Sequence, residues 1–244
     1  EQVEKNYITK IEAVKDRLLL ACVSSMTGHQ IIGGIRFSKL IKNICGAPIV
    51  WGGWHPTLLA EETLREAYVN FVITGQGEMA FKELVRHIIV GDTDYSGLSG
   101  LGYKREEKIF INKKADFINI NQFPKVNFKL LDLNNYVFKS AYSERCLGYF
   151  SSHGCPFNCA FCCVAEVYGR RWYNKEIAEI IEDLRYFKEV ANIDSVTFDD
   201  DNFFVNKNFT LKLCRAMIEA GLNLKWDTSA HAAGPRADPA PPAS

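Results

Sequence analysis

Three closely spaced cysteines are the residues of this sequence best suited to chemistry. Cys155, Cys159 and Cys162 follow the pattern Cys-x-x-x-Cys-x-x-Cys, and the aromatic Phe161 directly precedes the third. Three soft thiolates on one short loop can bind three irons of a cubane cluster and leave the fourth iron without a protein ligand. An open iron can bind a substrate or cofactor, whereas a site that only carries electrons usually has a fourth cysteine. The spacing therefore predicts a 4Fe-4S cluster with one open iron.

Two other uses of these cysteines have to be weighed. The chain has 8 cysteines in 244 residues and no stretch typical of a secretory signal, so we expect a reducing, cytoplasmic compartment and no disulfide framework. Zinc is the stronger rival, because Cys-x-x-Cys is common in zinc ribbons, but zinc needs a fourth ligand. His153 could donate, Cys163 is expected to point elsewhere, and a second Cys-x-x-Cys pair is absent. A non-catalytic iron-sulfur or zinc-binding module is thus an alternative to an enzyme.

The elements after the cysteine loop are predicted to be helix, strand, helix and strand. Apolar residues at three- and four-residue steps indicate a helix that follows an Asn174 N-cap and runs to about residue 190. A strand at 193–198, a helix at 207–220 and a strand at 222–226 come next. Short connections of this kind indicate parallel βαβ units.

Three adjacent carboxylates, Asp199 to Asp201, end the predicted strand at 193–198. Neighbouring carboxylates repel one another, so such a run occurs where solvent or a cation is close. Without further context, a solvated strand end or a helix cap would be the favoured interpretation of this run. The active sites of parallel barrels, however, lie at the carboxyl ends of strands, and both the cysteine loop and the acidic run follow predicted strands. We therefore interpret the two as parts of one site.

The stretch 146–226 resembles the radical S-adenosylmethionine (SAM) superfamily, and its pattern Phe-x-Asp-Asp-Asn-Phe is typical of a cobalamin-associated branch. The resemblance implies a (β/α) barrel whose cysteine loop follows the first strand. It also implies that SAM binds the open iron and is cleaved reductively to a 5′-deoxyadenosyl radical. Phe161 matches a position near the adenine, and Asp200 and Asp201 match an acidic position that accepts hydrogen bonds from the SAM amino group. The implied ligands of the 4Fe-4S cluster are Cys155, Cys159 and Cys162.

The first part of the chain alternates strands and helices, which predicts a doubly wound parallel sheet. The expected strands cover 17–23, 48–51 and 70–74, and the expected helices cover about 31–44, 58–68 and 78–89. The whole chain is therefore expected to be an α/β protein, with this sheet followed by a partial (β/α) radical SAM barrel.

Glycines lie at the carboxyl ends of the predicted strands, where such sheets bind ligands. They let the backbone approach a large, flat or anionic ligand, although tight turns of an ordinary α/β domain have the same composition. Two short segments resemble the cobalamin-binding domain that precedes many radical SAM domains. They are Val-Trp-Gly-Gly-Trp-His-Pro-Thr and Thr-Gly-Gln-Gly-Glu, the second with Gln76 where that family usually has Glu. His55 is interpreted as a cap or turn residue, because the Asp-x-His-x-x-Gly signature of histidine-ligated cobalamin is absent. The resemblance implies cobalamin contacts by Ser25, Met26, Thr27, Gly52, Gly53, Gly75 and Gly77.

We predict four segments along the chain. They are a cobalamin-binding-like α/β domain at 1–92, a connector at 93–144 with a hairpin at 101–111, the amino-terminal part of a barrel at 145–230, and a disordered Ala- and Pro-rich tail at 231–244. The chain opens without Met and its composition changes abruptly at the tail, so we expect a fragment with about half of a barrel.

Composition restricts the partners. Lys plus Arg and Asp plus Glu both number 29, so the net charge is zero and no nucleic-acid partner is expected. No apolar run reaches about eighteen residues, so no membrane span is expected, although a lipid or pigment substrate is compatible with the chain. The family resemblance implies a small-molecule or lipid- or pigment-like substrate and an electron donor such as a flavodoxin or ferredoxin.

The sequence thus predicts a cobalamin-dependent radical SAM enzyme, or the amino-terminal piece of one. Methyl transfer to an unactivated carbon is the leading outcome that the resemblance implies, and ring formation or oxidation are the others. A radical SAM enzyme that does not use cobalamin is a further alternative.

Overall fold

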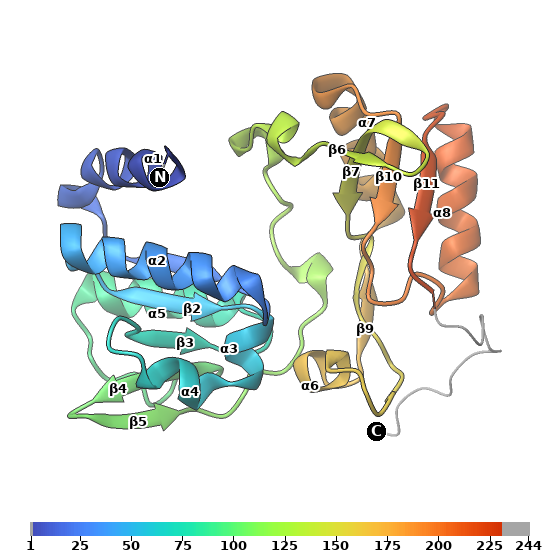
Figure 1. Cartoon of the computed structure of the whole chain (residues 1–244). Coiled ribbons are helices and arrows are strands. Elements are labelled where there is room, and N and C mark those ends of the chain that lie inside the picture. Colours follow the sequence, from blue (N-terminus) through green and yellow to red (C-terminus); the bar gives the residue numbers. More distant parts are fainter. Residues whose placement is uncertain (1, 231–244) are drawn as a thin grey trace. The chain divides into compact units, whose positions relative to one another are not determined.

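The computed structural model describes residues 2–230, with the side chains described from residue 4 onward. Contacts divide the chain into two compact units, Glu1–Phe117 and Ile118–Ser244 (Figure 1). The tail predicted at 231–244 lies outside the described residues. No helix among residues 2–230 is long and apolar enough to cross a membrane.

The first unit contains a five-stranded sheet with the order β1-β2-β3-β4-β5. The first three strands are parallel, and β4 and β5 form an antiparallel hairpin that pairs with β3. The strands are β1 (Ala21–Ser24), β2 (Ile49–Gly52), β3 (Phe71–Ile73), β4 (Leu101–Arg105) and β5 (Lys108–Ile111). The helices are α1 (Gln2–Glu12), α2 (His29–Ile44), α3 (Trp54–Leu58), α4 (Ala60–Arg65) and α5 (Glu78–Val90).

Helices cover both faces of this sheet, as the doubly wound prediction requires. Successive residues of a strand point to opposite faces, and neighbours Val50 and Trp51 of β2 are both buried. Trp51 belongs to a core with Ile41 of α2 and Leu64 of α4, whereas Val50 packs in a second core with Leu84 of α5. This burial on both sides explains why the parallel strands read as continuous apolar runs instead of alternating ones.

The second unit contains a four-stranded sheet with the order β11-β10-β7-β6. Strands β7 (Ser143–Tyr149), β10 (Ser195–Phe198) and β11 (Lys225–Thr228) are parallel, and β6 (Phe138–Ser140) is an antiparallel edge. Helices α7 (Ile177–Ala191) and α8 (Lys207–Glu219) connect the parallel strands, and fully buried residues such as Leu184 and Phe187 of α7 pack against them. Three parallel strands with crossover helices form part of a (β/α) barrel, as predicted.

A second, two-stranded sheet forms the base of the cysteine loop. Strand β8 (Ser152–Gly154) pairs antiparallel with β9 (Trp172–Asn174), and the short helix α6 (Val164–Tyr168) lies between them in the chain. Asn174 therefore ends a strand and does not cap α7, which corrects the predicted N-cap. Its side-chain amide donates to the Lys175 carbonyl at 2.9 Å, and Glu176 occupies the cap position.

The segment predicted as a connector at 93–144 is divided between the two units. Strand β4 pairs with β3 in the register Phe71↔Tyr103, and Leu101 is fully buried, so the hairpin belongs to the first sheet. The chain then passes through the 3-10 turns Ile120–Gln122, Phe128–Leu130 and Leu133–Tyr136 before β6. The predicted helix at 58–68 forms two short helices, α3 and α4, because Leu59 leaves the helical conformation (φ −131°, ψ 54°).

Candidate functional site

The cysteine loop, residues 155–171, begins and ends at the β8–β9 ladder. The register Gly154↔Trp172 holds the two ends of the loop side by side. Within it, the Cys162 amide donates to the Cys159 carbonyl at 2.9 Å, which forms a tight turn between two of the predicted ligands. Phe161, inside this turn, is 94% exposed, an unusual state for a phenyl ring. Local structure thus presents the cysteines and an exposed aromatic ring on one loop.

The donor set of this loop fits a cubane cluster. All three cysteines are free thiols, and the described side chains contain no group of His, Cys, Asp and Glu that converges on a single metal ion. A cubane would bind each of the three thiolates at a different iron. Burial raises the pKa of the Cys155 thiol, opposed by a hydrogen bond from the Phe157 backbone. A cation such as iron beside this thiol would favour its deprotonated form.

His153, the other donor considered for zinc, packs against an aromatic ring. Its ring stacks on Phe150, with ring centroids 5.4 Å apart and planes 15° apart. Burial, and secondarily the charge of Lys175, lower the pKa of His153 to about 4, so its ring is neutral at pH 7. The residue acts as a packed aromatic of β8.

The three carboxylates of the acidic run have different environments. Alternation along β10 places Asp199 on the face of Thr197 and Asp200 on the buried face of Phe198. Asp199 is exposed and lies over Gly148, so that a Cβ at this glycine would clash with its Oδ2. Burial raises the pKa of all three carboxyl groups.

Asp200 points into the protein and is surrounded by hydrogen-bond donors. It is 2% exposed and accepts hydrogen bonds from the Ser151 amide at 3.0 Å, the Ser151 hydroxyl at 2.8 Å and the Ser152 hydroxyl. Asp201 is half-buried and accepts from the Gly154 amide at 2.8 Å, one residue before Cys155. Of the two predicted SAM contacts, Asp201 therefore is the one with access to the surface.

The sequence interpretation missed the two serines and Trp172. The Trp172 indole donates to the Ser152 hydroxyl at 3.0 Å, and both serines are buried. The one local feature of the sequence that could have indicated a role for the serines is their position directly before His-Gly-Cys. Serine is usually exposed, so burial of this pair could not be read from composition.

The loops at the carboxyl ends of β1 and β2 contact each other closely. The Ser25 amide donates to the Gly52 carbonyl and the His55 amide donates to the Ser25 carbonyl, both at 3.0 Å. Thr27 Oγ1 lies 3.1 Å from His55 Nδ1, so His55 joins two loops, as the turn interpretation predicts. Ser25 is 1% exposed, whereas Met26 is 53% exposed. Of these predicted contacts, Met26 and Thr27 therefore lie on the outer side of the loop.

The loop after β3 is joined to the loop after β2 through Thr57, a residue that the sequence interpretation did not select. Its hydroxyl donates to the Gly53 carbonyl at 2.7 Å and accepts from the Gly75 amide at 3.0 Å. Gly53 and Gly75 have positive φ angles of 93° and 73°, which favour glycine. Gly77 has an ordinary helical conformation at the start of α5. The predicted cobalamin residues thus form one rim at the carboxyl edge of the parallel strands.

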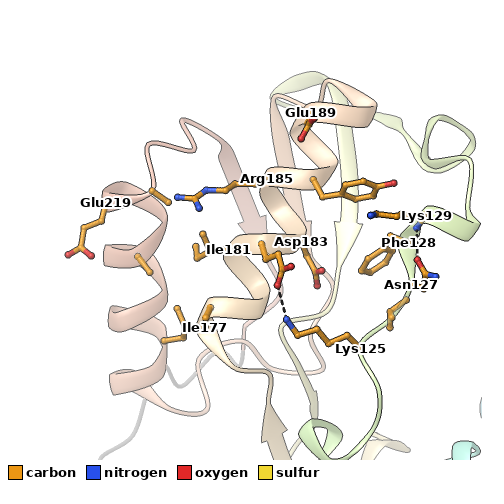
Figure 2. Close-up of a pocket in the computed structure, with 16 residues that line it drawn as sticks. Lys125, Asn127, Phe128, Lys129, Ile177, Ile181, Asp183, Arg185, Glu189 and Glu219 are labelled. Atoms are coloured by element: carbon orange, nitrogen blue, oxygen red, sulfur yellow. Dashed lines mark hydrogen bonds and ion pairs between the residues drawn. The ribbon is translucent and has the colours of Figure 1, made fainter.

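A groove on the helix layer of the second unit is separate from these predicted residues (Figure 2). It is lined by the segment 125–129, by α7 and by the end of α8. Lys125 crosses to α7 and pairs with Glu182 at 2.7 Å. The lining contains none of the predicted cluster, SAM or cobalamin residues.

Comparison with known proteins agrees with this organisation. Residues 149–239 match the family model of the Radical SAM superfamily. The chain is 32% identical over 195 residues to an uncharacterized methyltransferase of Pyrococcus horikoshii, an overlap that covers 79% of this chain and 42% of that protein. It is 23% identical over 208 residues to the anaerobic magnesium-protoporphyrin IX monomethyl ester cyclase of Synechocystis sp., covering 85% of this chain and 41% of the cyclase. The chain thus spans less than half the length of these curated relatives.

Solved structures share the fold of both units. The cobalamin-dependent SAM radical enzyme OxsB, with aqua-cobalamin and SAM bound, superposes with a TM-score of 0.72 at 16% identity, covering 93% of this chain and 32% of OxsB. The radical SAM methyltransferase TsrM from Kitasatospora setae, with cobalamin and a [4Fe-4S] cluster bound, gives a TM-score of 0.67 at 16% identity, covering 88% of this chain and 43% of TsrM. With its cysteine loop, its βαβ order and the family match, the segment 149–239 of this chain belongs to the radical SAM superfamily.

Proposed function

We propose that this chain is the cofactor-binding part of a cobalamin-dependent radical SAM enzyme that acts on an unactivated carbon, with methyl transfer as the reaction. The observation that carries the proposal is the presence, in one chain, of a three-cysteine loop, whose β8–β9 base follows the parallel strand β7, and of a glycine-containing rim at the carboxyl ends of the parallel strands of the first unit. Methyltransferase names among the relatives, and the cofactors in the OxsB and TsrM structures, support it.

Cys155, Cys159 and Cys162 would hold a 4Fe-4S cluster by one thiolate per iron. When bound, the cluster supplies the electron for reductive cleavage of SAM and the open iron to which SAM attaches. Phe161 projects from the same turn and offers an exposed ring for stacking on a planar base such as adenine. Asp201 offers the half-buried carboxylate for the SAM amino group while it holds the Gly154 amide.

The rim of the first unit would hold cobalamin through its backbone. Gly52 leaves an open position at the strand end, because a Cβ there would meet no atom within 4 Å, whereas Gly53 and Gly75 allow the close approach of Ser25 and of the Lys114 side chain. Met26 and Thr27 add an exposed thioether and hydroxyl beside them. Cobalamin, when bound, carries the methyl group that is transferred. The substrate is proposed to be a small molecule of lipid or pigment type, and a flavodoxin or ferredoxin is the proposed electron donor.

Anaerobic metal analysis of single cysteine variants tests the cluster. We expect about four iron and four sulfide per chain in the wild type, and a loss of most iron in Cys155→Ser, Cys159→Ser and Cys162→Ser. Cys163→Ser is the matched control, because Cys163 is exposed, adjacent and outside the motif, and it should keep its iron. One zinc per chain, or equal iron loss in the control, would contradict the assignment.

The two cofactors can be tested independently. Addition of SAM to the anaerobic protein should change the electron paramagnetic resonance spectrum of the reduced cluster, because SAM binds the open iron. Reconstitution with hydroxocobalamin should leave a corrin absorbance band with the protein after desalting. A protein with the cluster response and no corrin band would be a radical SAM protein without cobalamin, which is the second candidate function.

A further inference from the structure

The buried carboxylate of Asp200 connects the end of β10 to the base of the cysteine loop. It receives two hydrogen bonds from Ser151 and one from Ser152, the first residue of β8. Phe198, which precedes the acidic run, is fully buried between the sheet and its helices. Asp200 therefore follows directly from the rigid core of the second unit.

The returning arm of the loop joins the same network. The Ser152 hydroxyl that donates to Asp200 accepts from the Trp172 indole at 3.0 Å, and Trp172 is the first residue of β9. The next acidic residue, Asp201, accepts from the Gly154 amide at 2.8 Å. Both arms of the loop are therefore attached to two consecutive residues at one strand end. We call Ser151, Ser152, Gly154 and Trp172 the neck of the cysteine loop.

The energetics of this network favour a single arrangement of the neck. A buried carboxylate is costly unless donors surround it, and hydrogen bonds to a charged acceptor are the strong ones. Ser151 supplies both its amide and its hydroxyl, so the neck cannot shift without leaving Asp200 unpaired in the interior. All of the hydrogen bonds named here join groups of the chain itself.

We propose that Asp200 is a positioning residue that fixes the neck of the cysteine loop in the folded chain before any cluster is bound. The proposal depends on the proposed function only for what the loop holds. Asp200 acts through Ser151, Ser152 and Trp172, and the adjacent Asp201 keeps its carboxylate nearer the surface. Because the neck is already ordered in the folded chain, cluster binding would lose less conformational entropy in the loop, and this would favour binding.

Hydrogen exchange of the cluster-free protein tests the neck directly. Asp200→Asn keeps the size of the side chain but replaces one acceptor oxygen with an amide donor that faces the serine donors. We expect the amides of residues 151–154 and 172–174 to exchange about tenfold faster or more in this variant. Leu184→Ala is the matched control, because Leu184 is buried in the same core and is not a neck residue. It should lower global stability without a selective change at the neck.

Two milder variants at Ser152 provide the same test if Asp200→Asn does not fold. Ser152→Ala should also accelerate exchange at the neck, whereas Ser152→Thr keeps the hydroxyl and should restore most of the protection. In a double-mutant cycle, the double variant Ser152→Ala/Asp200→Asn should accelerate neck exchange by less than the two single variants added together. Neck exchange equal to wild type in Asp200→Asn or Ser152→Ala would overturn the proposal.

Cluster measurements separate this inference from the proposed function. If the wild type binds about four iron, Asp200→Asn and Ser152→Ala should bind less, and Ser152→Thr should recover it. If the wild type binds no iron, the proposed function fails, but the exchange result still decides the role of Asp200. Full iron binding with faster neck exchange would retain the structural role and reject the effect on the cluster.

Discussion

Replacement of Gly53 by alanine is expected to damage the rim of the first unit through two separable effects. Gly53 has φ 93° and ψ −166°, a backbone region that is essentially restricted to glycine. A Cβ at this position would also lie 2.9 Å from the Ser25 carbonyl oxygen and 3.0 Å from the Ser25 amide nitrogen. Backbone atoms cannot rotate away as a side chain can, so the loop after β1 would have to move.

A matched glycine allows the two effects to be separated. Gly28 has nearly the same backbone conformation, φ 128° and ψ −148°, but a Cβ there would meet no atom within 4 Å. Gly28→Ala should therefore cost only the backbone strain, about 1–3 kcal/mol. Gly53→Ala should cost the same strain and an overpacking cost of about 1–3 kcal/mol, or about 2–6 kcal/mol in total.

Urea denaturation followed by hydrogen exchange of the β2 and β3 amides reports on the first unit alone. The proposed function adds a second measurement, because the displaced Ser25 loop should weaken hydroxocobalamin binding in Gly53→Ala. If Gly53→Ala and Gly28→Ala destabilise the first unit equally, contact with Ser25 does not determine the rim and the reasoning is wrong.

Three further outcomes are expected. Phe187→Ala, which empties a fully buried position of α7, should lower the free energy of unfolding of the second unit by about 3–5 kcal/mol in chemical denaturation. Asn206→Ala removes the side chain that accepts from the Phe209 amide at 3.0 Å and should cost about 1 kcal/mol in the same assay, whereas Asn206→Ser should recover most of it. Burial raises the pKa of Tyr68 to about 12, so the folded chain keeps this proton longer than the unfolded chain, whose tyrosine titrates near 10. The stability that this proton contributes is complete below pH 10 and is lost as the pH rises through about 12, so Tyr68→Phe should unfold less steeply than wild type in an alkaline titration.

Features that depend on neighbouring residues in the chain followed from the sequence alone. The sequence patterns behind these features are local. They are the cysteine spacing, the apolar period of α7 and the glycine-containing segments after β2 and β3. The helix α7 and the loops after β2 and β3 lie where these patterns predict them. The parallel βαβ order also followed, because short connections between strand and helix patterns allow few topologies. The sequence therefore determined the fold class and the position of the three-cysteine loop.

Features that depend on pairing between distant segments were decided only by the tertiary structure. The hairpin β4–β5 joined the first sheet because β3 offered a free edge to Leu101 and Tyr103, a contact that no local pattern records. Asn174 became a strand residue because β8 pairs with β9 around the cysteine loop. Among three identical carboxylates, strand alternation and the donors of Ser151 selected Asp200 for the interior. Local composition is the same for all three, whereas burial depends on what packs against each one, and that is set by residues about fifty positions away in the chain.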